Sequence, residues 1–147
     1  MDRGDIARTV VRVSARPHAI LRLQWSDGVS VDLDLCTILR DRRFRRLSDP
    51  KEFARVHVGD WGHSVEWDSG PELSAETLWL LTLSATGRSD AREFLEWRLK
   101  HGLSLSGAAN ALGLSRRMVA YYSNGEKRVP RAIQLACKGW EVSEAAA

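Results

Sequence analysis

The 147-residue sequence predicts an α+β protein, in which a small domain of antiparallel hairpins and one helix precedes an all-helical domain. Apolar residues alternate with polar ones in the first part of the chain, whereas helical spacing begins near residue 91. A small, polar, unpatterned stretch separates the two patterns. We therefore expect an α+β domain over residues 1–85, a linker over 86–90, a helical domain over 91–141 and a disordered tail over 142–147.

The first strands are indicated by two-residue alternation of apolar side chains, which is typical of half-buried strands. One strand is expected around Val11–Val13 and a second over Ile20–Trp25. Asp27-Gly28 then supplies a hairpin turn before a third strand over Val29–Leu33, because this dipeptide adopts the backbone angles of tight turns. The pattern predicts a three-stranded meander.

A second hairpin is predicted over residues 55–58 and 64–67. Gly70-Pro71 is expected to close the sheet region. Ser74 stands where an N-cap residue is needed before the apolar run Leu78–Leu83. We expect this helix to cover one face of the sheet.

Five arginines fall within residues 40–46. Such a run could contact phosphate, but the nearby acids Asp41, Asp49 and Glu52 favour a solvated surface. Of the tryptophans, Trp25, Trp67 and Trp79 are expected in the core. Trp61, between two glycines, is expected to be exposed at a partner surface.

Neither the cysteines nor the histidines show a metal-ligand spacing, so no metal or other cofactor is expected. Cys36 and Cys137 are interpreted as buried or half-buried thiols. No nucleophile and base, paired carboxylates or phosphate-binding glycine loop stand at a recognisable spacing, and we expect no catalytic residues. The sequence also contains no apolar stretch long enough for a membrane span, which favours a cytoplasmic protein.

Charge is divided unevenly along the chain. Residues 1–87 contain 12 Lys and Arg against 13 Asp and Glu, whereas residues 88–147 contain 10 against 6. The second part therefore has a net charge of +4, and it is the candidate for an anionic partner.

The helical domain contains the pattern of two helices joined by a short turn. Ser104 can cap a first helix that ends at Leu112, and Ser115 can cap a second helix from Arg116 to Ser123. Ala109 is small enough for the helices to cross closely, and Gly113 tolerates the positive φ of the turn. Val119 should face the shared core. This spacing predicts a helix-turn-helix that binds duplex DNA.

The second helix would then enter the major groove, and the following loop would reach the phosphate backbone. Tyr121 is expected to face outwards and Tyr122 inwards, because adjacent helical residues point in different directions. Pro130 is expected at the first position of the last helix. The predicted DNA-binding residues are Ser104, Ser115, Arg116, Arg117, Ala120, Tyr121, Asn124, Lys127 and Arg128.

The segments Gly102–Ser115 and Asn124–Pro130 resemble the helix-turn-helix of the Cro and phage-repressor type. This resemblance implies an all-helical, often dimeric DNA-binding unit in which the helix of Arg116 and Arg117 contacts bases and the helix starting near Ser104 contacts phosphate. The chain departs from the pattern at three positions. Leu105 stands where the family commonly has Gln, and Gly107 and Ser123 stand where it often has Glu.

The first half resembles the bacterial domain-of-unknown-function family 2442. The resemblance rests on Trp25–Gly28, Asp32-Leu33, Phe53–Val56 and Val65–Trp67 through Gly70–Leu73. It implies a small α+β domain of bacteria, sometimes encoded beside toxin and antitoxin partners, and it implies no agreed activity.

Together these features predict a bacterial or phage-derived transcriptional regulator, in the manner of an antitoxin or repressor. Its expected partners are double-stranded DNA, a second copy of the chain and a toxin-like protein. The alternative is a protein-interaction adaptor whose helical domain does not bind DNA, which the missing Gln and Glu favour. An enzymatic activity of the first domain is a weaker third hypothesis.

Overall fold

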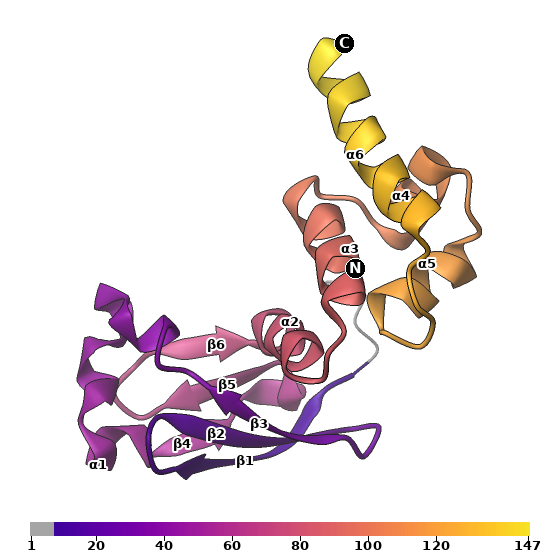
Figure 1. Cartoon of the computed structure of the whole chain (residues 1–147). Helices are drawn as coiled ribbons and strands as arrows, with labels where there is room; N and C mark the ends of the chain where they lie inside the picture. The colour runs from indigo at the N-terminus through magenta and orange to yellow at the C-terminus, as the bar shows by residue number, and fades with distance from the viewer. Residues whose placement is uncertain (1–7) are drawn as a thin grey trace. The chain divides into compact units, whose positions relative to one another are not determined.

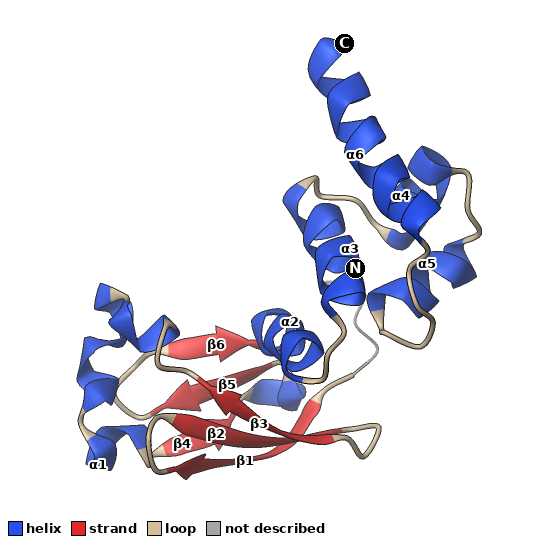
Figure 2. Cartoon of the chain, in the orientation of Figure 1, coloured by secondary structure: helices blue, strands red, loops and turns tan. Residues whose placement is uncertain are grey.

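The computed structural model describes residues 8–147, and these form two compact units, 8–86 and 87–147 (Figure 1). The first unit contains antiparallel sheets and short helices, and the second is entirely helical, which confirms the predicted α+β class (Figure 2). No helix among residues 8–147 has both the length and the apolar character needed to cross a bilayer.

The first sheet of the N-terminal unit contains β1 (Val10–Arg16), β2 (Ile20–Trp25) and β3 (Ser30–Asp34), in that order and antiparallel. Leu21 pairs with Leu33 and Leu23 with Val31. Leu21, Leu23 and Trp25 alternate along β2 and are fully buried, so two-residue alternation places one face of this meander in the core as predicted.

The second sheet contains β4 (Val56–Val58), β5 (Ser64–Trp67) and β6 (Glu72–Ser74). The prediction that Gly70-Pro71 closes the sheet region was wrong. Gly70 has a φ of 115° and donates its backbone N–H to the carbonyl of Trp67 at 2.9 Å, so it forms the hairpin turn that leads into β6.

Helix α2 (Ala75–Ala85) is capped by Ser74, as predicted, and packs against β3 and β6. Its buried Trp79 contacts Trp25 edge-on at 5.3 Å between ring centroids. The indole N–H of Trp25 donates to the Thr82 hydroxyl at 3.1 Å, which satisfies a polar group inside the core. Trp67 is also buried, whereas Trp61 is 88% exposed. All four predictions about these tryptophans' burial are confirmed.

Short helices connect the two sheets. These are 3₁₀ helices over Ile38–Arg40 and Arg42–Ser48, followed by α1 (Pro50–Phe53). Phe44 and Leu47 point into the core, and the arginines of this segment are exposed. Cys36 is exposed, contrary to the prediction of a buried or half-buried thiol, because it follows the end of β3 in a surface turn. Cys137 is buried.

The C-terminal unit contains α3 (Ser89–Lys100), α4 (Leu105–Leu112), α5 (Arg116–Ser123) and α6 (Arg131–Ala146). Helix α3 begins inside the segment 86–90 that was expected as a linker, since Arg88 and Asp90 make hydrogen bonds within this unit. Helix α6 runs through most of the expected disordered tail 142–147, where no Gly or Pro interrupts it. Pro130 is the N-cap residue of α6 and not its first helical residue.

Candidate nucleic-acid interface

Helix α4 and the turn after it are fixed by local hydrogen bonds. The Ser104 side-chain oxygen accepts the backbone N–H of Gly107 at 2.9 Å, which caps the helix. Gly113 ends α4 in the left-handed region with a φ of 70°. The backbone N–H of Leu114 then donates to the carbonyl of Ala109 at 2.9 Å, so the chain turns sharply before α5.

Helix α5 packs across α4 through small and apolar side chains. Ala108 and Val119 are fully buried, and Ala109 is nearly so. Tyr122 is buried against Phe94 of α3, with ring centroids 5.5 Å apart. The Ser115 side-chain oxygen caps α5 by accepting the backbone N–H of Met118 at 3.0 Å. Both predicted caps and the inward position of Val119 are therefore present in the structure.

The outer side of α5 carries positive charge around an aromatic ring. Arg116 and Arg117 are exposed, and Tyr121 is half-buried. The guanidinium of Arg117 donates from Nε to the Tyr121 hydroxyl at 2.6 Å, and Nζ of Lys127 lies 5.0 Å from the centroid of the same ring. We call Arg116, Arg117, Tyr121 and Lys127 the α5 basic face.

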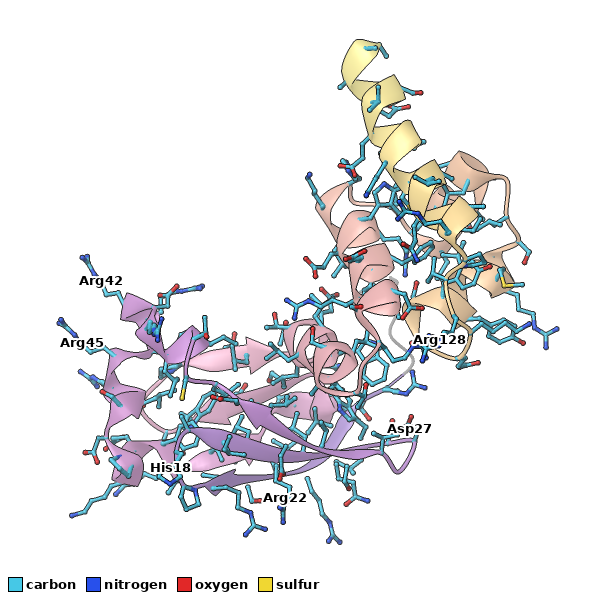
Figure 3. All side chains as sticks on the ribbon, viewed as in Figure 1. His18, Arg22, Asp27, Arg42, Arg45 and Arg128 are labelled. Atoms are coloured by element: carbon cyan, nitrogen blue, oxygen red, sulfur yellow. The ribbon has the colours of Figure 1, made fainter. Side chains whose placement is uncertain are left out.

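The other predicted residues lie in different surroundings. Ser104 and Ser115 are exposed cap residues, and Ala120 is half-buried. Asn124 is buried, with 7% of its surface exposed, so the structure does not place it on the outer face. Its position as the C-cap residue of α5 turns it inwards. Arg128 is exposed on the loop between α5 and α6 (Figure 3).

This loop is held by two residues that precede it by almost forty positions. Arg88 donates to the carbonyl oxygens of Gly125 and Lys127, the second at 3.1 Å. The carboxylate of Asp90 accepts the backbone N–H of Val129 at 2.9 Å and lies 3.8 Å from Arg128. We call Arg88 and Asp90 the loop clamp. It holds the backbone that carries Lys127 and Arg128 against the start of α3.

The pKa of Asp90 reflects this arrangement. Burial by itself would raise the pKa, but the hydrogen bonds from Arg88 and from the Val129 N–H favour the charged carboxylate and bring the pKa down to about 2. Asp90 is therefore ionised at neutral pH, and its charge supports the conformation of the loop.

Sequence reasoning missed the loop clamp and one buried cation. Arg98 of α3 is 1% exposed, and its Nη1 donates to the Ser123 hydroxyl at 2.7 Å. That hydroxyl in turn donates to the carbonyl of Val119 at 2.8 Å. Ser123 thus belongs to the core between α3 and α5. Arg88 and Asp90 are charged residues at a helix start. No nearby residue indicated that Arg88 would donate to the carbonyls of Gly125 and Lys127, or that Asp90 would accept the N–H of Val129.

Among residues 8–147, no group of His, Cys, Asp and Glu side chains is arranged to hold a metal ion. The chemistry available at the α5 basic face is that of hydrogen-bond donors and positive charge. Arginine can donate two parallel hydrogen bonds to a guanine edge or to a phosphate, and lysine can pair with phosphate.

The fold and this face define a class of protein, a small α+β unit joined to a helical unit with a basic outer helix. Residues 10–81 match the family described as protein of unknown function DUF2442. This match lies within the N-terminal unit and supports the resemblance of that unit inferred from the sequence. The match ends before the helical unit, so the similarity of that unit to the Cro and phage-repressor type remains a prediction.

One solved structure is similar over most of the chain. It is the crystal structure of a candidate DNA binding protein from Nitrosomonas europaea, with 38% sequence identity and a TM-score of 0.69. The similarity covers 91% of this chain and 86% of that one, and so includes both units. No curated protein matches the sequence.

Proposed function

We propose that the protein is a sequence-specific DNA-binding transcriptional regulator in which α4 and α5 form a helix-turn-helix. The observation on which this rests is the α5 basic face. The left-handed turn at Gly113 and the close packing at Ala109 leave Arg116 and Arg117 exposed in the first turn of α5. In a helix-turn-helix, these are the positions that meet base edges in the major groove.

The surroundings of α5 support the same role. Lys127 and Arg128 stand on a loop whose backbone is held by the loop clamp, so their charges can approach phosphate with little loss of backbone freedom. The exposed N-terminus of α4, capped by Ser104, offers backbone N–H groups and a positive helix end to a second phosphate. The Nitrosomonas europaea protein, described as a candidate DNA binding protein, is similar over both units, which adds support.

Selection from a random duplex library, followed by fluorescence anisotropy at ~150 mM salt, tests the proposal. A selected sequence should bind at least about a thousandfold more tightly than random duplex. Arg116→Ala with Arg117→Ala should remove this preference and reduce the dependence of affinity on salt. Lys100→Ala with Lys138→Ala is the matched control, since both lysines are exposed in the same unit and the change in net charge is equal.

The adaptor hypothesis is favoured by one specific position. Leu105 replaces a Gln expected to contact DNA, and its side chain packs against the helical core. If the arginine double variant binds duplex DNA as well as the unchanged protein does, with circular dichroism confirming the fold, the helical unit is an interaction module and the regulator proposal fails.

A regulator of this type would act as a homodimer in the bacterial cytoplasm. A role as an antitoxin-like or phage-derived repressor, with a toxin-like protein as the partner of the N-terminal unit, is the most specific form of the proposal. Its support is the match of that unit to the DUF2442 family together with the exposed Trp61.

A further inference from the structure

We propose that the N-terminal unit binds a small organic carboxylate in a groove beside the turn between β1 and β2. The groove has a volume of about 870 Å³, which is within the usual range for small-molecule sites. Its walls come from that turn, from the two 3₁₀ helices and from α1. This site is separate from the α5 basic face and does not depend on DNA binding.

The floor of the groove is apolar. Leu47 and Phe53 lie beneath it and are buried in the core, and Leu39 is half-buried. Ala54, at the end of α1, is exposed along its edge. An alkyl chain or an aromatic ring placed on this floor would be removed from water, which favours binding.

One wall of the groove is held in a fixed shape. His18 and Ala19 both adopt the left-handed backbone, with φ values of 67° and 59°. The carbonyl of Ala19 accepts the backbone N–H of Leu35 at 2.9 Å, and the thiol of Cys36 donates to the carbonyl of His18 at 3.7 Å. Because non-glycine residues adopt this conformation only at a cost, the surrounding contacts must maintain it. The wall is therefore formed before any ligand arrives.

The charged groups that line the groove are basic. They are Arg16 and Arg40, and no carboxylate among the described residues lines it. Asp41, next to Arg40, binds Arg43 at 3.1 Å, and Asp49, next to Ser48, accepts the backbone N–H of Lys51 at 3.0 Å. Asp32, whose charge interacts with Arg16, is paired with Arg22 at 2.8 Å. The guanidinium groups of Arg16 and Arg40 thus complement an anion.

Further arginines extend this positive potential. Arg42 and Arg45 extend outwards from the ribbon (Figure 3). Together with Asp41 they line a second depression, which shares Leu39, Arg40 and Ser48 with the groove. Fields from clustered cations raise the local concentration of anions. The apolar floor nevertheless favours a carboxylate with an apolar body over a nucleic-acid backbone, which has no apolar group to place there.

The groove is suited to reversible binding. Cys36 lines it, but the Asp34 carboxylate beside it raises the pKa of this thiol, and the charge of Arg40 opposes this effect only in part. The thiol therefore stays protonated at neutral pH and is a poor nucleophile.

Isothermal titration of the full chain with octanoate tests the proposal, with octylammonium as the probe of opposite charge. Octanoate should bind with a Kd on the order of 100 µM, and octylammonium should not bind.

Arg16→Ala with Arg40→Ala should weaken octanoate binding at least about tenfold, since both charge partners of the carboxylate are lost. Ala54→Trp, which fills the groove from its edge, should abolish binding. Arg12→Ala, an exposed change on the same strand as Arg16, should leave the Kd unchanged.

Amide chemical shifts provide a second measurement that does not depend on any variant. Octanoate should move the signals of residues 15–19, 36–40 and 47–54 and leave those of α5 in place. The proposal fails if octanoate does not bind, if octylammonium binds equally well, or if the groove variants bind octanoate like the unchanged chain. Displacement of octanoate by short duplex DNA would instead identify a phosphate-binding surface and would also overturn it.

Discussion

Asp90 is a residue whose charge links two segments that are distant in the sequence. Its carboxylate accepts the N–H of Val129 and pairs with Arg88, and its side chain is only 14% exposed. Hydrogen bonds to a charged group are stronger than neutral ones, and loss of the carboxylate would leave the Val129 N–H without this acceptor. The residue therefore stabilises the loop between α5 and α6.

The first prediction concerns pH. Because the pKa of Asp90 falls from 3.8 to about 2 on folding, its contribution is complete above pH 3.8 and is lost as the pH falls towards 2. Asp90→Asn should reduce the free energy of unfolding by about 1 to 2 kcal/mol at pH 7. Urea unfolding between pH 7 and pH 2 measures both chains, and their difference should shrink below pH 4. Glu93→Gln, an exposed change on the same helix, is the control. A difference that does not change with pH would contradict this account.

Gly113 provides a second prediction at the residue scale. A Cβ at this position would meet nothing within 4 Å, so its φ of 70° is the sole obstacle to a side chain. Gly113→Ala should therefore cost about 1 kcal/mol of stability, and Gly113→Asn less, because Asn adopts the left-handed region more readily. Thermal unfolding ranks the two variants. Equal losses for Ala and Asn would show that the backbone angle does not determine the cost.

At the scale of elements, the crossing of α4 and α5 depends on the size of one side chain. Ala109 is 7% exposed and lies in the core that also contains Ala108, Val119 and Tyr122. A larger residue would separate the helices and change the direction in which α5 presents Arg116 and Arg117. Stability and the geometry of the α5 basic face should therefore change together.

Ala109→Leu tests this coupling. Overpacking should lower stability by about 1 to 3 kcal/mol and should weaken binding to the selected DNA sequence even where the variant remains folded. Asn110→Leu adds a similar side chain at the exposed neighbouring position and should affect neither property strongly. Urea unfolding and fluorescence anisotropy on the same samples separate the two effects. If the Ala109→Leu protein is destabilised but binds DNA with unchanged affinity, the crossing of α4 and α5 does not determine DNA recognition.

The ends of helices that depend on a few adjacent residues could be predicted from the sequence. Ser74, Ser104 and Ser115 cap helices where expected, and Gly113 ends α4, because caps and tight turns depend on a few adjacent residues. The loop clamp and the burial of Arg98 could not be predicted, since their partners lie 25 to 39 residues away. The β5–β6 turn was missed because a Gly-Pro pair marks a turn without indicating whether another strand follows it.

The same distinction applies to the candidate sites. Arg116, Arg117 and Tyr121 share one helix, so helical periodicity alone brings them together. The groove of the N-terminal unit is formed by three separate segments, residues 15–19, 36–40 and 47–54. No spacing in the sequence indicates that Arg16 and Arg40 line one groove.

For the whole molecule, the two parts of the chain differ in charge. Residues 88–147 have a net charge of +4, and residues 1–87 have a net charge of −1. DNA would be attracted to the helical unit, and the other unit adds no net attraction. A single helix in the major groove contacts few base pairs, so we expect a regulator of this size to bind DNA as a pair of chains.

The final prediction is therefore the geometry of the DNA site. Two chains related by a two-fold axis should select an inverted repeat with half-sites about one helical turn, ~34 Å, apart. Lengthening the spacer by about half a turn should abolish cooperative binding, because one half-site then faces away, whereas a full turn should restore part of it. Anisotropy on the three spacers measures this, and light scattering of the complex should find two chains of 16.5 kDa per duplex. A single chain per duplex, with affinity independent of the spacer, would rule out dimeric recognition.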